Sequence, residues 1–138
     1  MPYELLNPVC LPLPTSPHLA ARAAGVRIDI AAIAAAYARL EQRADVVVVE
    51  GAGGWLAPID DAGATMQDVA LALNLPVLLV VGMRLGCISH ALLTQQAIAA
   101  CGLTLAGWVA NDIEPGFDAD GAYARALAQR LAAPRLTL

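Results

Sequence analysis

The sequence predicts an α/β fold built on a doubly wound parallel sheet with helices on both of its faces. Helical and strand-like segments alternate along the chain with short links, as in βαβ units, whose right-handed crossovers make neighbouring strands parallel. The strand-like segments are continuous apolar runs such as Val46–Val49, which indicates strands covered on both faces. With 138 residues and no internal repeat or linker, residues 1–138 are expected to form a single partial domain of this class.

The first half of the chain is assigned from periodicity and end signals. Residues 1–17 contain five prolines and are expected to form a loop-like segment that looks like the continuation of a fold and not its start. Asp29 is a suitable N-cap for a helix with one apolar face, and Thr65 to Asp68 resembles a capping box. The expected elements are a helix over about Asp29–Gln42, a strand over Val46–Glu50, a glycine-rich loop to about Ala64 and a helix over Met66–Leu73.

The second half continues the same alternation. Gly102 is placed to end a helix with a left-handed backbone. The stripe formed by Tyr123, Leu127 and Leu131 is typical of a helix that packs on a core. The expected elements are a buried strand over Pro76–Val81, a turn at Gly82–Gly86, a helix over about Cys87–Ala100, a strand over Leu103–Ala110 that ends at Asn111 and Asp112, and a helix over about Asp118–Leu131.

Composition excludes several classes of protein. The net charge of −4 and the scattered arginines do not suit a nucleic-acid surface. The most apolar stretch, Leu75–Met83, is far shorter than the roughly 20 residues of a membrane span, and the first residues lack the basic start of a secretory signal. Three cysteines without metal-ligand spacing argue against a disulfide framework or a structural metal. We therefore expect a soluble, cytoplasmic protein with no nucleic-acid or membrane partner.

Glu50 gives the best single indication of function. It follows the run Val46–Val49 and would lie at the carboxyl end of a parallel strand, the edge where open α/β sheets bind ligands. Gly51, Gly53 and Gly54 allow the backbone to turn and to approach a ligand closely. A carboxylate there suits Mg²⁺, which takes hard oxygen ligands together with substrate phosphates. The alternative is a tight turn with a solvated Glu50.

Three strand ends are expected to converge on one sheet edge: Glu50, Gly82–Gly86 and Asn111–Asp112. The Asn111 amide can both donate and accept hydrogen bonds, as reading a purine edge requires, although an ordinary turn explains Asn111–Asp112 as well. Gly86 opens a helix whose free amides and dipole favour an anion such as a carboxylate, and Ser89 could add a hydroxyl. Here the alternative is a glycine that only permits the turn.

The chain has no lysine, since all 8 of its basic residues are arginine. It also lacks the G-x-x-x-x-G-K-[ST] loop that holds phosphates and magnesium opposite a strand-end carboxylate in nucleotide-binding folds. A phosphate site that needs lysine must therefore obtain it from outside these residues.

Four segments resemble dethiobiotin synthetase, and the match covers most of the chain in order. They are P-T-S-P-H at Pro14–His18, E-G-A-G-G-W at Glu50–Trp55, P-V-L-L-V-V-G-M-R-L-G-C-I-S-H-A-L-L-T at Pro76–Thr94 and L-A-G-W-V-A-N-D at Leu105–Asp112. This family is a homodimeric P-loop fold that uses ATP, Mg²⁺ and carbon dioxide to close the ureido ring of dethiobiotin on 7,8-diaminononanoate, a step of biotin synthesis. The resemblance implies a carbon–nitrogen ligase in which the diamine forms a carbamate, ATP phosphorylates it and the second amine closes the ring.

The resemblance also implies roles for individual residues. Glu50 resembles the magnesium ligand, and the residues that resemble the nucleotide site are Glu50, Gly51, Ala52, Gly53, Asn111 and Asp112, the last two on the adenine side. The residues that resemble the site for the diamine, including its carboxylate across the dimer interface, are Ser16, Gly86, Cys87, Ile88, Ser89 and Tyr123. The first expectation for Tyr123 from periodicity remains a place in the core stripe of its helix.

Two departures qualify the resemblance. Ser89 stands where the family pattern has Asn, so its shorter hydroxyl reaches less far or acts through water. The family's first strand and P-loop, which lie N-terminal to the matched part, have no counterpart here, and neither has the segment that lines the adenine pocket after residue 138. We therefore expect the isolated chain to be inactive. The alternatives are a noncatalytic homologue that serves as a dimerising or small-molecule-binding module, and a remnant without a stable fold.

Overall fold

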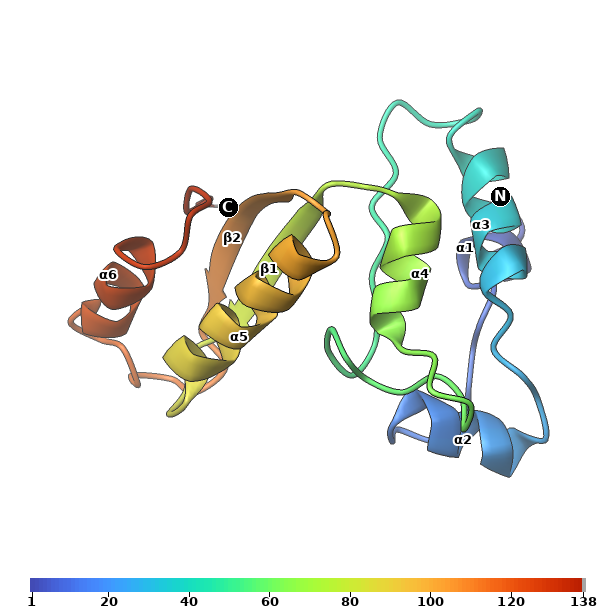
Figure 1. Cartoon of the computed structure of the whole chain (residues 1–138), viewed down its shortest axis with the longest axis horizontal. Coiled ribbons are helices and arrows are strands. Elements are labelled where there is room, and N and C mark those ends of the chain that lie inside the picture. Colours follow the sequence, from blue (N-terminus) through green and yellow to red (C-terminus); the bar gives the residue numbers. More distant parts are fainter. Residues whose placement is uncertain (138) are drawn as a thin grey trace. The chain divides into compact units, whose positions relative to one another are not determined.

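The computed structural model describes residues 1–137. They pack as two compact units, Met1–Asn74 and the described residues from Leu75 onward, which run from blue to green and from green to red in Figure 1. The expectation of one domain over 1–138 remains a prediction, because packing into units does not show which parts fold independently. Among the described residues no helix is both long and apolar enough to cross a membrane.

The first unit is built from helices. α3 contacts both α1 and α4, and within residues 1–74 the only strand-like pairing is one antiparallel bridge between Pro58 and Thr65. The helices of this unit are α1 (Tyr3–Leu6), α2 (Pro17–Ala24), α3 (Ile30–Leu40) and α4 (Met66–Leu73).

The starts of α3 and α4 confirm two predictions from the sequence. The Asp29 carboxylate accepts hydrogen bonds from the backbone N–H groups of Ala31 and Ala32 at 2.9 and 3.3 Å, as an N-cap does. Thr65 and Asp68 form the predicted capping box, in which the Asp68 carboxylate accepts from the Thr65 N–H at 2.7 Å and from its hydroxyl at 3.0 Å. These two hydrogen bonds, the backbone one above all, lower the pKa of the Asp68 carboxyl.

The prediction of an irregular N-terminal segment over residues 1–17 is wrong in part. Tyr3–Leu6 form one helical turn, and α2 begins at Pro17. In the first turn of a helix a backbone N–H has no partner within the helix, so the missing N–H of proline costs nothing there. The fixed φ of proline also suits a helix start, and Pro17 therefore begins α2 without breaking it. α2 ends at Gly25, which has a left-handed φ of 66°.

The predicted strand Val46–Glu50 does not form. The segment has no regular secondary structure, and the side chains of Val46 and Val48 are 78% and 86% exposed. A β-branched run becomes a strand only where a neighbouring strand accepts and donates its backbone hydrogen bonds. Residues 1–74 offer no such neighbour, so this stretch remains apolar and open to solvent.

The second unit contains the sheet. β1 (Val77–Gly82) and β2 (Leu105–Asn111) pair in parallel, from Val77 opposite Leu105 to Gly82 opposite Asn111. α5 (Cys87–Ala100) connects the two strands and lies against them, and α6 (Ala122–Ala128) follows β2 (Figure 1). A strand–helix–strand unit with a parallel pair confirms the α/β class.

The last described residues extend the sheet beyond β2. The Trp108 N–H donates to the carbonyl of Pro134 at 3.0 Å, and the Leu136 N–H donates to the carbonyl of Trp108 at 2.8 Å. This is a parallel bridge between Trp108 and Arg135 on the edge of β2 opposite β1. The segment that carries Arg135 is therefore fixed to the sheet.

The core of the second unit lies between the sheet, α5 and α6. Trp108 and Leu127 are 0% exposed, and Cys87 is 2% exposed. The predicted stripe of the last helix is confirmed for Leu127 and Leu131, which are buried, whereas Tyr123 is half-buried against the same cluster. The buried residues of this cluster are Val81, Met83, Cys87, Ala91, Trp108, Ala124, Leu127 and Leu131.

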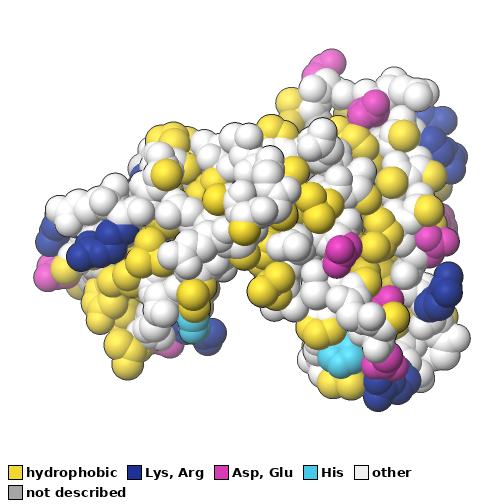
Figure 2. Space-filling model, viewed as in Figure 1, with side chains coloured by type: hydrophobic (Ala, Val, Ile, Leu, Met, Phe, Trp, Pro, Cys, Tyr) yellow, Lys and Arg dark blue, Asp and Glu magenta, His cyan; other side chains and the backbone are white. Residues whose placement is uncertain are grey.

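Two predictions for this unit need correction. β1 was expected to be buried on both faces, but the side chains of Leu78 and Val80 are exposed, and Figure 2 shows apolar side chains reaching the surface. The last helix was expected over Asp118–Leu131 and is shorter, because Gly121 has a left-handed φ of 71° and Asp118 caps the helix from outside. Leu131 directly follows the turn after α6, donates its N–H to the Leu127 carbonyl at 2.8 Å and still reaches the core.

Candidate functional site

Of the three strand ends expected to converge, those of β1 and β2 lie side by side, whereas the segment before Glu50 forms no strand. Gly82 is opposite Asn111, and the Met83 N–H donates to the Asn111 carbonyl at 2.7 Å. The turn before α5 and the pair Asn111–Asp112 therefore leave the sheet at the same edge. The Asn111 and Asp112 side chains are exposed there and accessible to a ligand.

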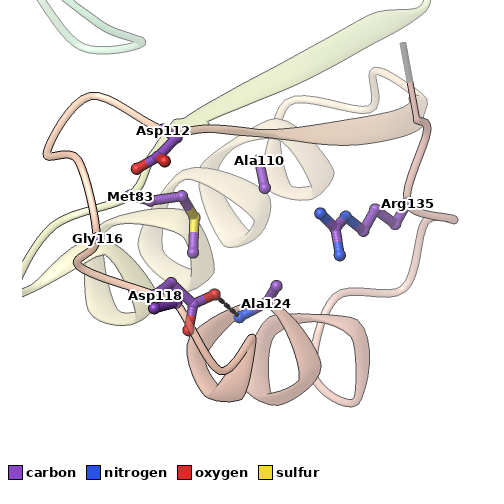
Figure 3. A pocket seen from close by; sticks show the side chains of 8 residues that line it. Met83, Ala110, Asp112, Gly116, Asp118, Ala124 and Arg135 are labelled. Atoms are coloured by element: carbon purple, nitrogen blue, oxygen red, sulfur yellow. Dashed lines mark hydrogen bonds between the residues drawn. The ribbon is translucent and has the colours of Figure 1, made fainter.

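A pocket with a volume of about 200 Å³ opens beside this edge. Figure 3 shows Asp112 above it, Asp118 below it, Met83 at the sheet side and Arg135 reaching in from the opposite wall. Its lining residues are Met83, Ala110, Asp112, Gly116, Asp118, Ala119, Ala124 and Arg135. The pocket thus has an apolar floor with charged groups of both signs around it.

Asp118 holds the lower wall of the pocket in place. Its two carboxylate oxygens accept hydrogen bonds from the backbone N–H groups of Tyr123 and Ala124 at 2.8 and 2.9 Å. Both acceptors are thus used by the first turn of α6, which fixes the loop from Asp112 to the helix. Sequence reasoning missed this role, although an Asp three residues before a glycine and a helical run was a usable signal.

The predicted anion site at the start of α5 has the expected backbone. Gly86 has a φ of 93° and occupies the N-cap position, where an L side chain would be strained. Ser89 is exposed and Ile88 half-buried, whereas the Cys87 side chain is in the core. The Cys87 backbone N–H donates to the Arg84 carbonyl at 3.0 Å, so Cys87 offers a ligand no free donor. Ser89 is the side chain here that can reach a ligand.

Tyr123 lies on α6 and packs against Phe117, with ring centroids 4.5 Å apart. It is half-buried beside the core cluster. This agrees with the expectation that Tyr123 lies on the apolar face of its helix. Because Tyr123 is only half-buried, part of its ring remains accessible.

The glycine turn after Glu50 belongs to the first unit, and Glu50, Gly51, Ala52 and Gly53 are all exposed. Gly53 has a φ of 81°, and a Cβ there would lie 2.9 Å from Cβ of Ala57. A Cβ on Gly51 would lie 3.0 Å from Cε of Met66. Gly53 is therefore required by its backbone and its packing, which the sequence could not distinguish from close approach of a ligand, whereas the flexible end of Met66 can move away from a side chain at position 51.

Ser16 and the glycine turn are neighbours, a proximity that sequence reasoning did not predict. A Cβ on Gly53 would lie 3.3 Å from Cδ of Pro17, the residue after Ser16. Ser16 Oγ is 3.0 Å from Nδ1 of His18, within hydrogen-bond distance, and the His18 N–H donates to the Pro58 carbonyl at 3.2 Å. The first unit therefore brings Ser16 to the same surface as the Gly53 turn.

The described residues do not form a complete metal site. Residues 1–137 contain no group of three or more His, Cys, Asp or Glu side chains placed to hold an ion. Glu50 is an exposed carboxylate. Such a donor fits a Mg²⁺ held jointly by one carboxylate and nucleotide phosphates, and it does not fit a cage made of protein ligands alone.

A family model described as AAA domain matches residues 1–136. The chain belongs to the AAA domain family. Membership confirms the α/β class predicted from the sequence, which the parallel pair of β1 and β2 shows independently.

Curated relatives of this AAA domain chain include three ATP-dependent dethiobiotin synthetases BioD. The protein of Aromatoleum aromaticum is 56% identical over 133 residues, which are 96% of this chain and 59% of the relative. Those of Xanthomonas axonopodis pv. citri and Vibrio cholerae are 50% and 48% identical over 96% and 99% of this chain, and 58% of each relative is covered. The similarity to dethiobiotin synthetase predicted from the sequence motifs is thus confirmed, and the chain spans about three fifths of the length of these relatives.

Proposed function

We propose that this chain is the part of an ATP-dependent dethiobiotin synthetase that binds the nucleobase, one side of the Mg²⁺–phosphate group and the carboxylate of 7,8-diaminononanoate. The observation that supports this most strongly is the 56% identity to a protein of that name over 96% of the chain. The substrates would be the diamine, carbon dioxide and ATP, and the active species a cytoplasmic homodimer. Activity would require the lysine-bearing phosphate loop, which these 138 residues do not contain.

On the nucleotide side, the chain supplies oxygen and amide groups. Asn111 and Asp112 are exposed at the edge of the sheet, and Asp112 lines the pocket, which supports the proposal that they would face a purine base. Glu50 would hold Mg²⁺, which neutralises phosphate charge when bound. The turn Gly51–Gly53 would bring backbone close to the phosphates.

On the diamine side, the start of α5 is the binding group. The backbone amides of Gly86, Ile88 and Ser89, the exposed Ser89 hydroxyl and the positive end of the helix dipole together favour a carboxylate. The accessible part of Tyr123 would assist there. Ser16, in the first unit, is a separate candidate contact for the diamine. Fixing the carboxylate orients the reacting amines, which lie at the opposite end of the substrate.

The test uses a hybrid in which the unmatched part of the Aromatoleum aromaticum relative is joined to this chain. Ser89→Ala in the hybrid should raise the KM for the diamine roughly tenfold, the effect of losing a hydrogen bond to a charged group, and leave kcat nearly unchanged. Steady-state formation of dethiobiotin at varied diamine concentration measures both constants.

The matched control is Thr94→Ala, which removes a hydroxyl from the same helix. Thr94 Oγ1 donates to the His90 carbonyl at 2.8 Å, within α5, so both constants should stay unchanged. A diamine analogue without the carboxylate should not distinguish Ser89→Ala from the parent hybrid. A fall in kcat at constant KM would contradict the placement of the carboxylate at Ser89.

A further inference from the structure

Arg135 is the one cation among the residues that line the pocket beside Asp112. Figure 3 shows its guanidinium extending into the pocket from the last described segment, with Asp112 across from it. Of the two carboxylates there, Asp118 already accepts two backbone hydrogen bonds. Arg135 and Asp112 are therefore the charged pair that a ligand in this pocket would meet.

Two contacts fix the position of Arg135. Its backbone bridges to Trp108 on β2, and its Cζ lies 5.6 Å from the centroid of the Trp108 ring. A guanidinium over an aromatic face uses that face for the cation–π contact and keeps the N–H groups at its edge for other partners. Because Trp108 is fully buried, the indole ring that the guanidinium packs against is held rigidly.

The donor and acceptor pattern of this pair matches one purine better than the other. An arginine fork donates two parallel hydrogen bonds to O6 and N7 of guanine, whereas adenine offers N7 beside a donor, N6–H₂. A carboxylate such as Asp112 can accept from the N1–H and N2–H₂ groups of guanine. Guanine therefore carries groups complementary to both Arg135 and Asp112, on two different edges of the base.

We propose that Arg135, with Asp112, makes this pocket accept guanine, so that a guanosine nucleotide serves this protein as well as an adenosine nucleotide does. The inference rests on the proposed function, because it takes the pocket beside Asp112 as the nucleobase site. It adds a specificity-determining residue, Arg135, that lies outside the motifs read from the sequence.

The test compares GMP and AMP, which share sugar and phosphate and differ in the base. Calorimetric titration of the full chain should give a Kd for GMP equal to or lower than that for AMP. Arg135→Leu should weaken GMP binding about tenfold and AMP binding less than about twofold. Arg135→Lys keeps the positive charge but loses the paired N–H donors of the guanidinium. This variant should therefore also lose most of the affinity for GMP that depends on Arg135.

Each other outcome would overturn the inference. If Arg135→Leu lost the same affinity for GMP as for AMP, Arg135 would contact the phosphate. If Arg135→Lys bound GMP as tightly as the parent chain, the positive charge alone would account for binding. If neither nucleotide bound, the pocket would not be a nucleobase site. In the hybrid, dethiobiotin formed with ATP but not with GTP would also overturn the inference and would leave the proposed function intact.

Discussion

Glu50→Gln in the hybrid enzyme is expected to lower kcat by about 100-fold or more while the Kd for the diamine stays the same. The amide preserves the size of the side chain and removes the charge that would hold Mg²⁺ against the phosphates. Because Glu50 is exposed, the loss cannot be assigned to a damaged core. Single-turnover kinetics and diamine titration measure the two quantities separately.

Glu41→Gln is the matched control for this variant. Glu41 is an exposed carboxylate of the same unit, at the end of α3, so its neutralisation should leave kcat within about twofold of the parent. Raising the Mg²⁺ concentration should restore part of the activity of Glu50→Gln. It should not restore activity that is lost for a reason other than weaker Mg²⁺ binding. Normal turnover of Glu50→Gln would remove Glu50 from the metal site.

Leu127→Ala is expected to reduce the free energy of unfolding of the second unit by about 3 kcal/mol. Leu127 is 0% exposed in the cluster that contains Trp108, and a truncation at such a site loses both transfer free energy and packing around the cavity. Urea unfolding measured by the fluorescence of Trp108, in a Trp55→Phe background, reports this unit alone.

Leu93→Ala provides the comparison, since it removes the same atoms from α5 at a side chain that is 61% exposed. Its expected cost is within about 0.5 kcal/mol. If the two variants unfolded at the same urea concentration, the cluster around Trp108 would not be the core of this unit.

Local signals in the sequence were sufficient for several helices. Asp29 and the pair Thr65–Asp68 satisfy helix-start amides with their own side chains, so α3 and α4 begin where the sequence predicts. α5 has the predicted bounds because Gly86 and Gly102 adopt left-handed backbones at its two ends. These features depend on residues close together in the chain.

Features that depend on distant partners were mispredicted or missed. Val46–Glu50 has the composition of a central strand, but strand formation requires a neighbour that residues 1–74 do not provide. The approach of Pro17 to Gly53 and the position of Arg135 over Trp108 are tertiary contacts without a local pattern. The strand ends of β1 and β2 converge as predicted because topology alone brings parallel strands to one edge.

The central claim is that this chain supplies the nucleobase, magnesium and carboxylate contacts of a dethiobiotin synthetase. The most direct test incubates the hybrid with 7,8-diaminononanoate, Mg-ATP and ¹³C-bicarbonate and follows the label by mass spectrometry. We predict ¹³C in the ureido carbon of dethiobiotin, with one ADP formed per product, and no product from the 138-residue chain alone, which has no lysine for the phosphates. A folded hybrid that binds nucleotide and diamine but forms no labelled dethiobiotin, or product from the chain alone, would contradict the claim.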